Sequence, residues 1–150
     1  MTNLTIKELG ANLLTSTNKT QSNLIRKEIK ARFESLEFST MGKAKRETTL
    51  SYIGSVNSSA KILKNAKLNF DTYIVYLSPS TISGFNTCSM ASEGCISACL
   101  HSSGRVIMDT KQTIHISRLL KTLLFYYNRN FFNAWLFTEI EKAQIKATKN

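Results

Sequence analysis

The sequence predicts a helix-rich α/β fold with a small sheet, which could form part of a barrel, and three observations support this fold class. Apolar residues recur at helical spacing over several long stretches of the chain. The short run at residues 72–77, TYIVYL, is β-branched and aromatic and is followed by Ser78 and Pro79, which is typical of a strand. All three cysteines follow that run closely. We therefore expect a cysteine loop directly after the clearest strand.

Two regions of one compact domain are expected within the 150 residues. Residues 1–49 should form a helical N-terminal region, with helices at residues 3–15 and 21–38 and an N-cap for the second at Ser22 or Asn23. This region ends in the polar stretch 39–49, which we interpret as a basic loop. The loop would expose Lys43, Lys45 and Arg46.

Residues 50–150 should form an α/β core that carries the cysteine motif. A short helix is expected at residues 57–67, before the predicted strand. After the cysteines, apolar stripes predict one helix up to Tyr127 and another from Phe131, with a break and a cap at residues 128–130. This helix pair would cover the strand and supply much of the core.

The charge of the chain favours anionic partners. Twenty basic and ten acidic residues give a net charge of +10 and a pI near 9.7, so nucleic acid, nucleotides or phosphate are plausible ligands. A solvated basic surface explains the excess equally well, because the charge is spread about evenly along the sequence. The apolar runs are too short for a membrane span and no secretory signal is recognisable, so a soluble cytoplasmic protein without a membrane partner is expected.

The three cysteines, Cys88, Cys95 and Cys99, follow a C-x6-C-x3-C spacing. Three thiolates can hold three irons of a [4Fe-4S] cube and leave the fourth iron open to a substrate or cofactor. Gly84 and Gly94 would let the loop fold back on itself. Cys95 and Cys99 would share one helix face if a helix begins near Gly94. The sequence therefore indicates an iron-sulfur centre.

Two alternatives to a cluster remain open. Zinc would need a fourth ligand, for which His101 or His115 is available at an unfamiliar spacing. The thiols could also be buried or merely reactive, without any metal. Lys121 and Arg129 are further cations that could reach such a site from the following helices, although solvent exposure explains them as well.

A turn after the cysteines, Ser103, Gly104 and Arg105, ends in a planar cation. Such a turn suits the binding of a carboxylate or phosphate near the metal. An ion pair between Arg105 and Asp109 is the alternative explanation.

The chain resembles a bacteriophage protein family of unassigned function. The resemblance rests on a Tyr-Leu-Ser-Pro segment at residues 76–79, a Ser-Gly-aromatic-Asn turn at residues 83–86, the cysteine motif, and the Ser-Gly-Arg turn. It covers most of residues 50–142, and family members generally continue further, so this chain would be a shortened version.

The resemblance implies a distant similarity to radical-SAM enzymes, with S-adenosylmethionine as a possible cofactor. Ser83, Gly84 and Asn86, with the Ser103–Arg105 turn, would then bind the cofactor. The expected function is a phage-encoded metal-binding protein, either a redox or radical-type enzyme or a remnant of one, and no catalytic residue is identified. The alternative is a basic accessory protein that binds nucleic acid or a host protein without catalysis.

Overall fold

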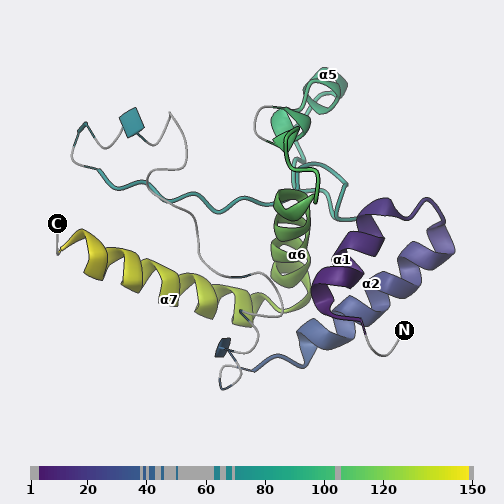
Figure 1. The fold of residues 1–150 in the computed structure, drawn as a ribbon, viewed down its shortest axis with the longest axis horizontal. Helices are drawn as coiled ribbons and strands as arrows, with labels where there is room; N and C mark the ends of the chain where they lie inside the picture. Colours follow the sequence, from purple (N-terminus) through teal and green to yellow (C-terminus); the bar gives the residue numbers. More distant parts are fainter. Residues whose placement is uncertain are drawn as a thin grey trace.

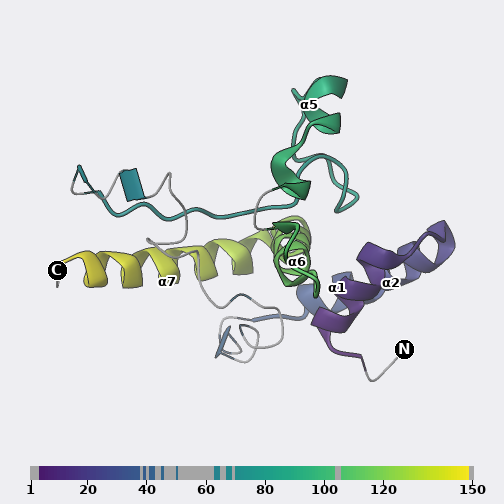
Figure 2. The same cartoon turned by 45° about the horizontal axis from the view of Figure 1, so that its top comes forward.

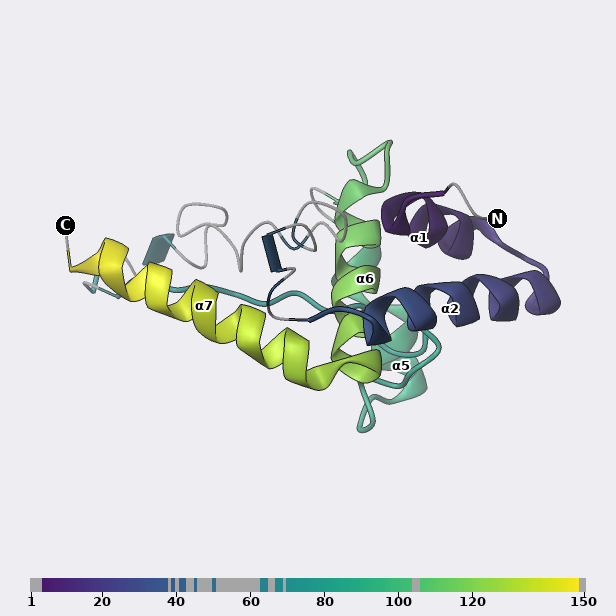
Figure 3. The same cartoon turned by 90° about the horizontal axis from the view of Figure 1, so that it is seen from below.

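The computed structural model describes residues 4–37, 39, 41–42, 45, 50, 63–64, 67–68, 70–103 and 106–148. Its helices are α1 (Ile6–Thr15), α2 (Lys19–Glu34), α5 (Glu93–Ser97), α6 (Thr113–Tyr127) and α7 (Arg129–Ala147), with a 3-10 turn η2 at Leu100–Ser102. The antiparallel pair α1 and α2 lies against one side of α6, and α7 leads away from the other side (Figures 1 and 3). The arrangement is a helical assembly around α6.

The predicted α/β fold, with its small sheet and partial barrel, is wrong, because the described residues contain no strand. The strand expected at residues 72–77 is an irregular segment that leads back toward α6 (Figures 1 and 2). A strand needs a neighbouring backbone to pair its N–H and C=O groups. Here the Ser78 N–H donates instead to the Thr122 hydroxyl of α6, at 2.8 Å. A side chain of a helix takes the place that a partner strand would fill.

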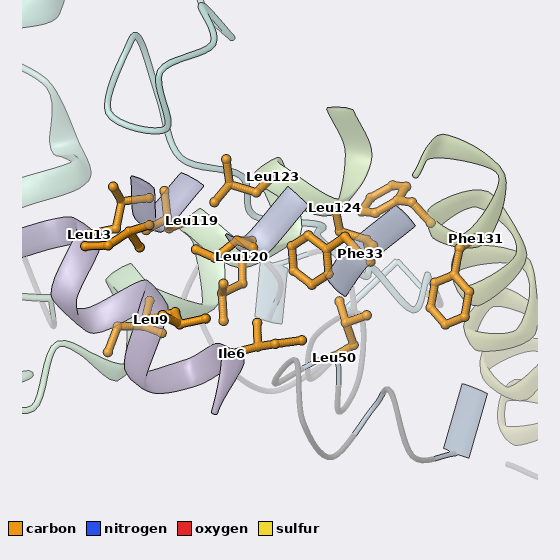
Figure 4. Close-up of a cluster of buried hydrophobic side chains, with 14 of the residues drawn as sticks. Ile6, Leu9, Leu13, Phe33, Leu50, Leu119, Leu120, Leu123, Leu124 and Phe131 are labelled. Carbon is orange, nitrogen blue, oxygen red and sulfur yellow. The ribbon is translucent and has the colours of Figure 1, made fainter. Parts of the chain in front are cut away.

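The core is built around α6 (Figure 4). Four leucines of this helix are completely buried: Leu119, Leu120, Leu123 and Leu124. The other helices add their apolar faces, namely Ile6, Leu9 and Leu13 of α1, Ile25, Ile29 and Phe33 of α2, and Phe131, Phe132 and Trp135 of α7. A Cβ at Gly10 of α1 would lie 3.1 Å from a methyl group of Leu120, so the two helices approach closely at this glycine.

The two N-terminal helices are confirmed with shifted bounds. Thr5 caps α1 in a capping box with Glu8. The cap of α2 is Asn18, and not Ser22 or Asn23 as expected, because its side-chain oxygen accepts the N–H groups of residues 20 and 21. The helix therefore begins earlier than the apolar pattern indicated.

The predicted break at residues 128–130 is confirmed, and Asn128 joins three helices there. Its side-chain oxygen accepts the Phe131 N–H at 3.1 Å and so caps α7. Its Nδ2 donates to the Phe33 carbonyl of α2 at 2.8 Å. One amide thus fixes the angle between α6 and α7 and holds the end of α2.

The basic loop expected at residues 39–49 is only partly described. The prediction that Lys45 is exposed is wrong, because its Nζ forms an ion pair with Glu139 Oε1 of α7 at 2.7 Å. Lys43 and Arg46 lie outside the described residues, as does most of the helix expected at residues 57–67. The division of the chain at residue 49 stays a prediction. Among the helices that the structure describes, none has the length and apolarity to cross a membrane.

The cysteine arm, defined as residues 79–103, stands away from the helical body beyond α6 (Figures 1 and 2). Arg26 of α2 holds its base by donating to the Ser83 carbonyl. Gly84 has a φ of +86°, and a Cβ at this position would collide with the Arg26 guanidinium. This position therefore requires glycine for two reasons, its backbone conformation and the closeness of Arg26.

Replacing Arg26 is expected to loosen the base of the arm. Arg26→Met leaves the buried carbonyl of Ser83 without its charged donor, which should cost about 1–3 kcal/mol of unfolding free energy. Amide hydrogen exchange in residues 80–90 should become faster than in the wild type. Lys27→Met is the matched control, because Lys27 is the exposed neighbour on the same helix. Unchanged exchange in the arm of Arg26→Met would contradict this role.

Glu139 should make the stability depend on pH. Burial alone would raise the pKa of Glu139, but hydrogen bonds and charges from Lys45 and Lys142 hold the pKa below its usual value. The stabilisation is therefore complete above the unfolded-state pKa of about 4.3 and is lost as the pH falls through the lower folded-state pKa.

Glu139→Gln should lower the free energy of unfolding by roughly 2 kcal/mol at neutral pH. The difference from the wild type should shrink in acid, where the wild-type carboxylate is protonated as well. Denaturant titrations over a pH series measure both values. Glu141→Gln, an exposed carboxylate on the same helix, is the control. An equal loss of stability in both variants would show that the ion pairs of Glu139 are not the cause.

Candidate functional site

The start of the cysteine arm forms a neck, defined as residues 78–88, whose two sides are joined by hydrogen bonds. Thr87 Oγ1 donates to the Ser78 carbonyl at 2.6 Å, and the Thr87 N–H donates to the Ser80 carbonyl at 3.1 Å. Between these contacts the chain turns through Ser80, which has a φ of +51°, and Gly84. The neck therefore has a defined shape before the first cysteine is reached.

Cys88 lies in this neck. Its sulfur accepts the Ser80 N–H at 3.2 Å, and its own N–H donates to the Asn86 side chain at 2.9 Å. N–H donation to sulfur is the contact that tunes thiolate ligands in iron-sulfur sites. Cys88 is a half-buried free thiol whose sulfur accepts one backbone hydrogen bond.

Cys95 lies within α5, and its N–H is capped by the Ser92 hydroxyl at 3.2 Å. It is an exposed free thiol. The helix that we expected to carry both Cys95 and Cys99 ends too early, at Ser97. Cys99 adopts an extended backbone, with φ −63° and ψ 128°, and precedes η2. The shared helical face was therefore a wrong prediction, since Ala98 already leaves the helix.

The thiols are not gathered around one point in the described part of the chain, where no three His, Cys, Asp or Glu side chains form a group able to hold a metal ion. α5 contributes no buried residue. Met90, Ile96 and Leu100 are among the exposed large apolar side chains. The arm thus has no apolar core of its own that would fix the positions of its thiols.

The predicted cofactor-binding residues shape the neck. The buried Ser83 hydroxyl exchanges hydrogen bonds with the Phe85 backbone, at 3.2 and 3.3 Å, and Gly84 lies under Arg26. Asn86 holds the Cys88 N–H. Ser103 donates to the Leu100 carbonyl at 3.0 Å. Gly104 and Arg105 lie outside the described residues, so the anion turn stays a prediction.

Phe85 attaches the neck to the C-terminal end of α6. Its ring stacks on Tyr126 with a centroid distance of 4.0 Å and meets the edge of Tyr127 at 5.5 Å. The Tyr126 hydroxyl is 3.4 Å from the Asn86 carbonyl. Stacked aromatic pairs of this kind stabilise a structure beyond the effect of burying their apolar surface. The aromatic position of the Ser-Gly-aromatic-Asn turn is therefore an anchor for the arm.

The other end of the arm is attached to α6 through two histidines. His101 Nε2 lies 2.8 Å from His115 Nδ1, and His101 Nδ1 lies 3.2 Å from Arg118 Nη1. Arginine can only donate, so His101 Nδ1 must accept and its proton must sit on Nε2, which donates to His115. Burial lowers the pKa of His101, and the neighbouring Arg118 guanidinium lowers it further. The imidazole of His101 is thus held neutral.

Sequence reasoning missed two members of this contact, Arg118 and Tyr76, whose ring lies 5.2 Å from the Arg118 guanidinium. For Lys121 it left a site role and solvent exposure both open, and the structure shows this side chain only 8% exposed. A signal was available for part of this cluster, because His115 and Arg118 are three apart and share a helix face. Arg129, the other candidate cation, lies 4.5 Å from the Phe125 ring.

A comparison with protein-family models finds a match. The model described as Gene product 88 matches residues 36–150, which is well over half of the chain and includes the whole cysteine arm. No curated protein and no solved structure matches the chain. The match is consistent with the resemblance to a phage family of unassigned function and leaves the likeness to radical-SAM enzymes untested. The chain belongs to the Gene product 88 family.

Proposed function

We propose that this member of the Gene product 88 family binds a metal centre, an iron-sulfur cluster, through Cys88, Cys95 and Cys99. One observation carries the proposal: the arm that holds the three cysteines has no apolar core. Its helix α5 buries no residue, and Ile96 is 47% exposed. Segments without a core are usually fixed by disulfides or metals.

A disulfide does not supply this cross-link, because Cys88 and Cys95 are free thiols. Metal coordination can supply it, since metal binding in small modules commonly brings the ligands together only when the ion is present. The neck and the two attachments to α6 limit how far the thiols have to move. The fit of the arm to a metal centre therefore rests on its three thiol donors and on the fixed ends of the arm.

The contacts of His101 favour a three-thiolate site over zinc with His101 as the fourth ligand. Both ring nitrogens of His101 are engaged, one with Arg118 and the other with His115. Binding of zinc through either nitrogen would break one of these hydrogen bonds, next to the positive charge of Arg118. A [4Fe-4S] cluster on three cysteines needs no fourth protein ligand and leaves one iron available for a ligand.

The chain's own residues would position such a cluster in two ways. The Ser80 N–H donates to the Cys88 sulfur and stabilises negative charge on it. Arg26 fixes the carbonyl of Ser83 and with it the turn that precedes Cys88. When bound, the cluster would supply electron transfer or activation of a ligand at the open iron. A redox or radical-type reaction, with S-adenosylmethionine as one cofactor to test, belongs to the same proposal.

A second candidate function, binding of nucleic acid or of a host protein, rests on the net charge of +10. The structure gives it weaker support, because basic side chains of α2 are partly neutralised by ion pairs. Arg32 pairs with Glu28 at 2.8 Å, and Lys30 pairs with Glu34 at 3.6 Å. The charge excess is therefore not concentrated on this helix face.

The metal proposal predicts iron and acid-labile sulfide in protein purified without oxygen, with visible charge-transfer absorption. Cys88→Ser, Cys95→Ser and Cys99→Ser should each lower the iron content at least about tenfold, because each removes one of three ligands. Ser97→Ala, on the same arm, should retain the iron and is the control. Stoichiometric zinc in a colourless protein would replace the cluster with a zinc site. Protein without any metal, before and after reconstitution, would refute the metal centre.

The second candidate predicts binding of DNA or RNA that weakens steeply with salt. Each phosphate contact should add about 0.9 to the slope of log affinity against log salt. Fluorescence anisotropy with a labelled oligonucleotide over a salt series measures this slope. The triple Cys→Ser variant should bind as the wild type does if the basic surface alone is responsible. Absence of binding at low salt would remove this candidate.

A further inference from the structure

Arg118 is held in place by its surroundings, but not all of its N–H groups are hydrogen-bonded in the described structure. Its guanidinium lies 5.2 Å from the centre of the Tyr76 ring, and its Nη1 donates to His101. Its Nε is buried and has no hydrogen-bond partner in the described structure. Nearly all buried polar groups in proteins are hydrogen-bonded, so an orphaned guanidinium N–H requires an explanation.

Lys121 lies one turn further along α6 and is also cationic and buried. Its side chain is 8% exposed, and its Nζ lies 5.9 Å from the Trp135 ring. Burial lowers the pKa of Lys121, and the positive charge of Arg118 lowers it further. The two cations are therefore close enough to repel each other in a partly desolvated environment, which costs free energy unless an anion offsets it.

No carboxylate offsets this charge in the part of the chain that the structure describes. The ion pairs found there involve α2 and Glu139, and neither Arg118 nor Lys121 takes part in one. Asp109 is the carboxylate at the start of α6, and the Ile114 N–H that it accepts lowers its pKa. Its other oxygen accepts from Thr113 Oγ1, so both oxygens are already used locally. Glu139 shows the opposite situation, a buried carboxylate with two lysines.

A second orphaned group lies against the same helix, next to Thr122. The Ser78 side chain is 1% exposed, and its Oγ has no hydrogen-bond partner among the described residues. Ser78 is located at α6 by its N–H, which donates to Thr122, the neighbour of Lys121. Thr122 in turn donates to the Arg118 carbonyl at 2.9 Å. The segment at residues 76–78 therefore crosses α6 at the turn that contains Arg118, Lys121 and Thr122.

We propose that Arg118, Lys121 and Ser78 form a binding site for an oxyanion, the phosphate group of a small molecule. The guanidinium offers directed N–H donors, the ammonium offers a point charge, and the hydroxyl offers a further donor, which together suit a tetrahedral anion. A small ligand fits better than a nucleic-acid backbone, because Lys121 is almost completely buried. The site goes beyond the proposed metal centre and does not depend on it.

The first test observes Arg118 directly in the folded wild type. Inorganic phosphate is titrated into isotope-labelled protein at constant ionic strength, and the Nε–H resonances of the arginines are followed by NMR. The Arg118 resonance should shift saturably, because its orphaned donor gains an acceptor. Chloride should leave this resonance unchanged. A shift with acetate equal to that with phosphate would reassign the site to carboxylates and overturn the phosphate proposal.

The second test uses stability. Phosphate should raise the melting temperature of the wild type above its value in chloride of equal ionic strength, because the ligand binds only the folded state. Arg118→Gln and Lys121→Met should abolish this increment. Lys19→Met, an exposed lysine of α2, should retain it and is the matched control.

The two proposals fail separately. The triple Cys→Ser variant should keep the phosphate-dependent increment even though it holds no metal. An unmoved Arg118 resonance together with equal melting temperatures in phosphate and chloride would overturn the oxyanion site. That result would leave the metal proposal intact.

Discussion

Burial of α6 against three other helices limits where the remaining described elements can lie. Leu119, Leu120, Leu123 and Leu124 are all fully buried, so this helix is covered on more than one face. α1, α2 and α7 take most of that surface, and the close approach at Gly10 leaves no space between α1 and α6. Truncation of a buried leucine in such a setting typically costs about 2–5 kcal/mol. The cysteine arm can therefore attach to α6 only at the helix's ends and along one remaining strip.

The attachments of the arm explain how a segment without a core can keep a defined base. Phe85 stacks on Tyr126 near one end of α6, and His101 contacts His115 near the other. Arg26 adds a third attachment from α2, which lies outside the residues matched by the Gene product 88 model. In this chain the matched region is thus supported by an N-terminal helix pair. The ends of the arm are fixed, whereas its tip relies on what its thiols bind.

The sequence predicted the four long helices well, because their apolar spacing and caps are local signals. Asn128 is the clearest case, since the residue that interrupts the apolar stripe is also the cap of α7. The strand at residues 72–77 was predicted from composition alone, and composition does not supply a partner strand. The sequence left the burial of Lys121 undecided for a related reason. Its burial results from contact with Trp135 and with distant chain segments, which helical periodicity does not encode.

The absence of a sheet from the described residues bears directly on the oxyanion site. A strand in a sheet would satisfy its backbone through its neighbours, but the segment at residues 76–78 must use side chains of α6 instead. His115, Arg118 and Thr122 recur at helical spacing along the strip that receives this segment and the end of the arm. Thr122 accepts the Ser78 N–H and Arg118 donates to His101, yet the Ser78 hydroxyl and the Arg118 Nε have no hydrogen-bond partner among the described residues. A polar strip of a helix that receives an irregular segment therefore keeps hydrogen-bond donors without acceptors. Because two cations lie next to each other on this strip, an anion is the ligand that best satisfies these donors.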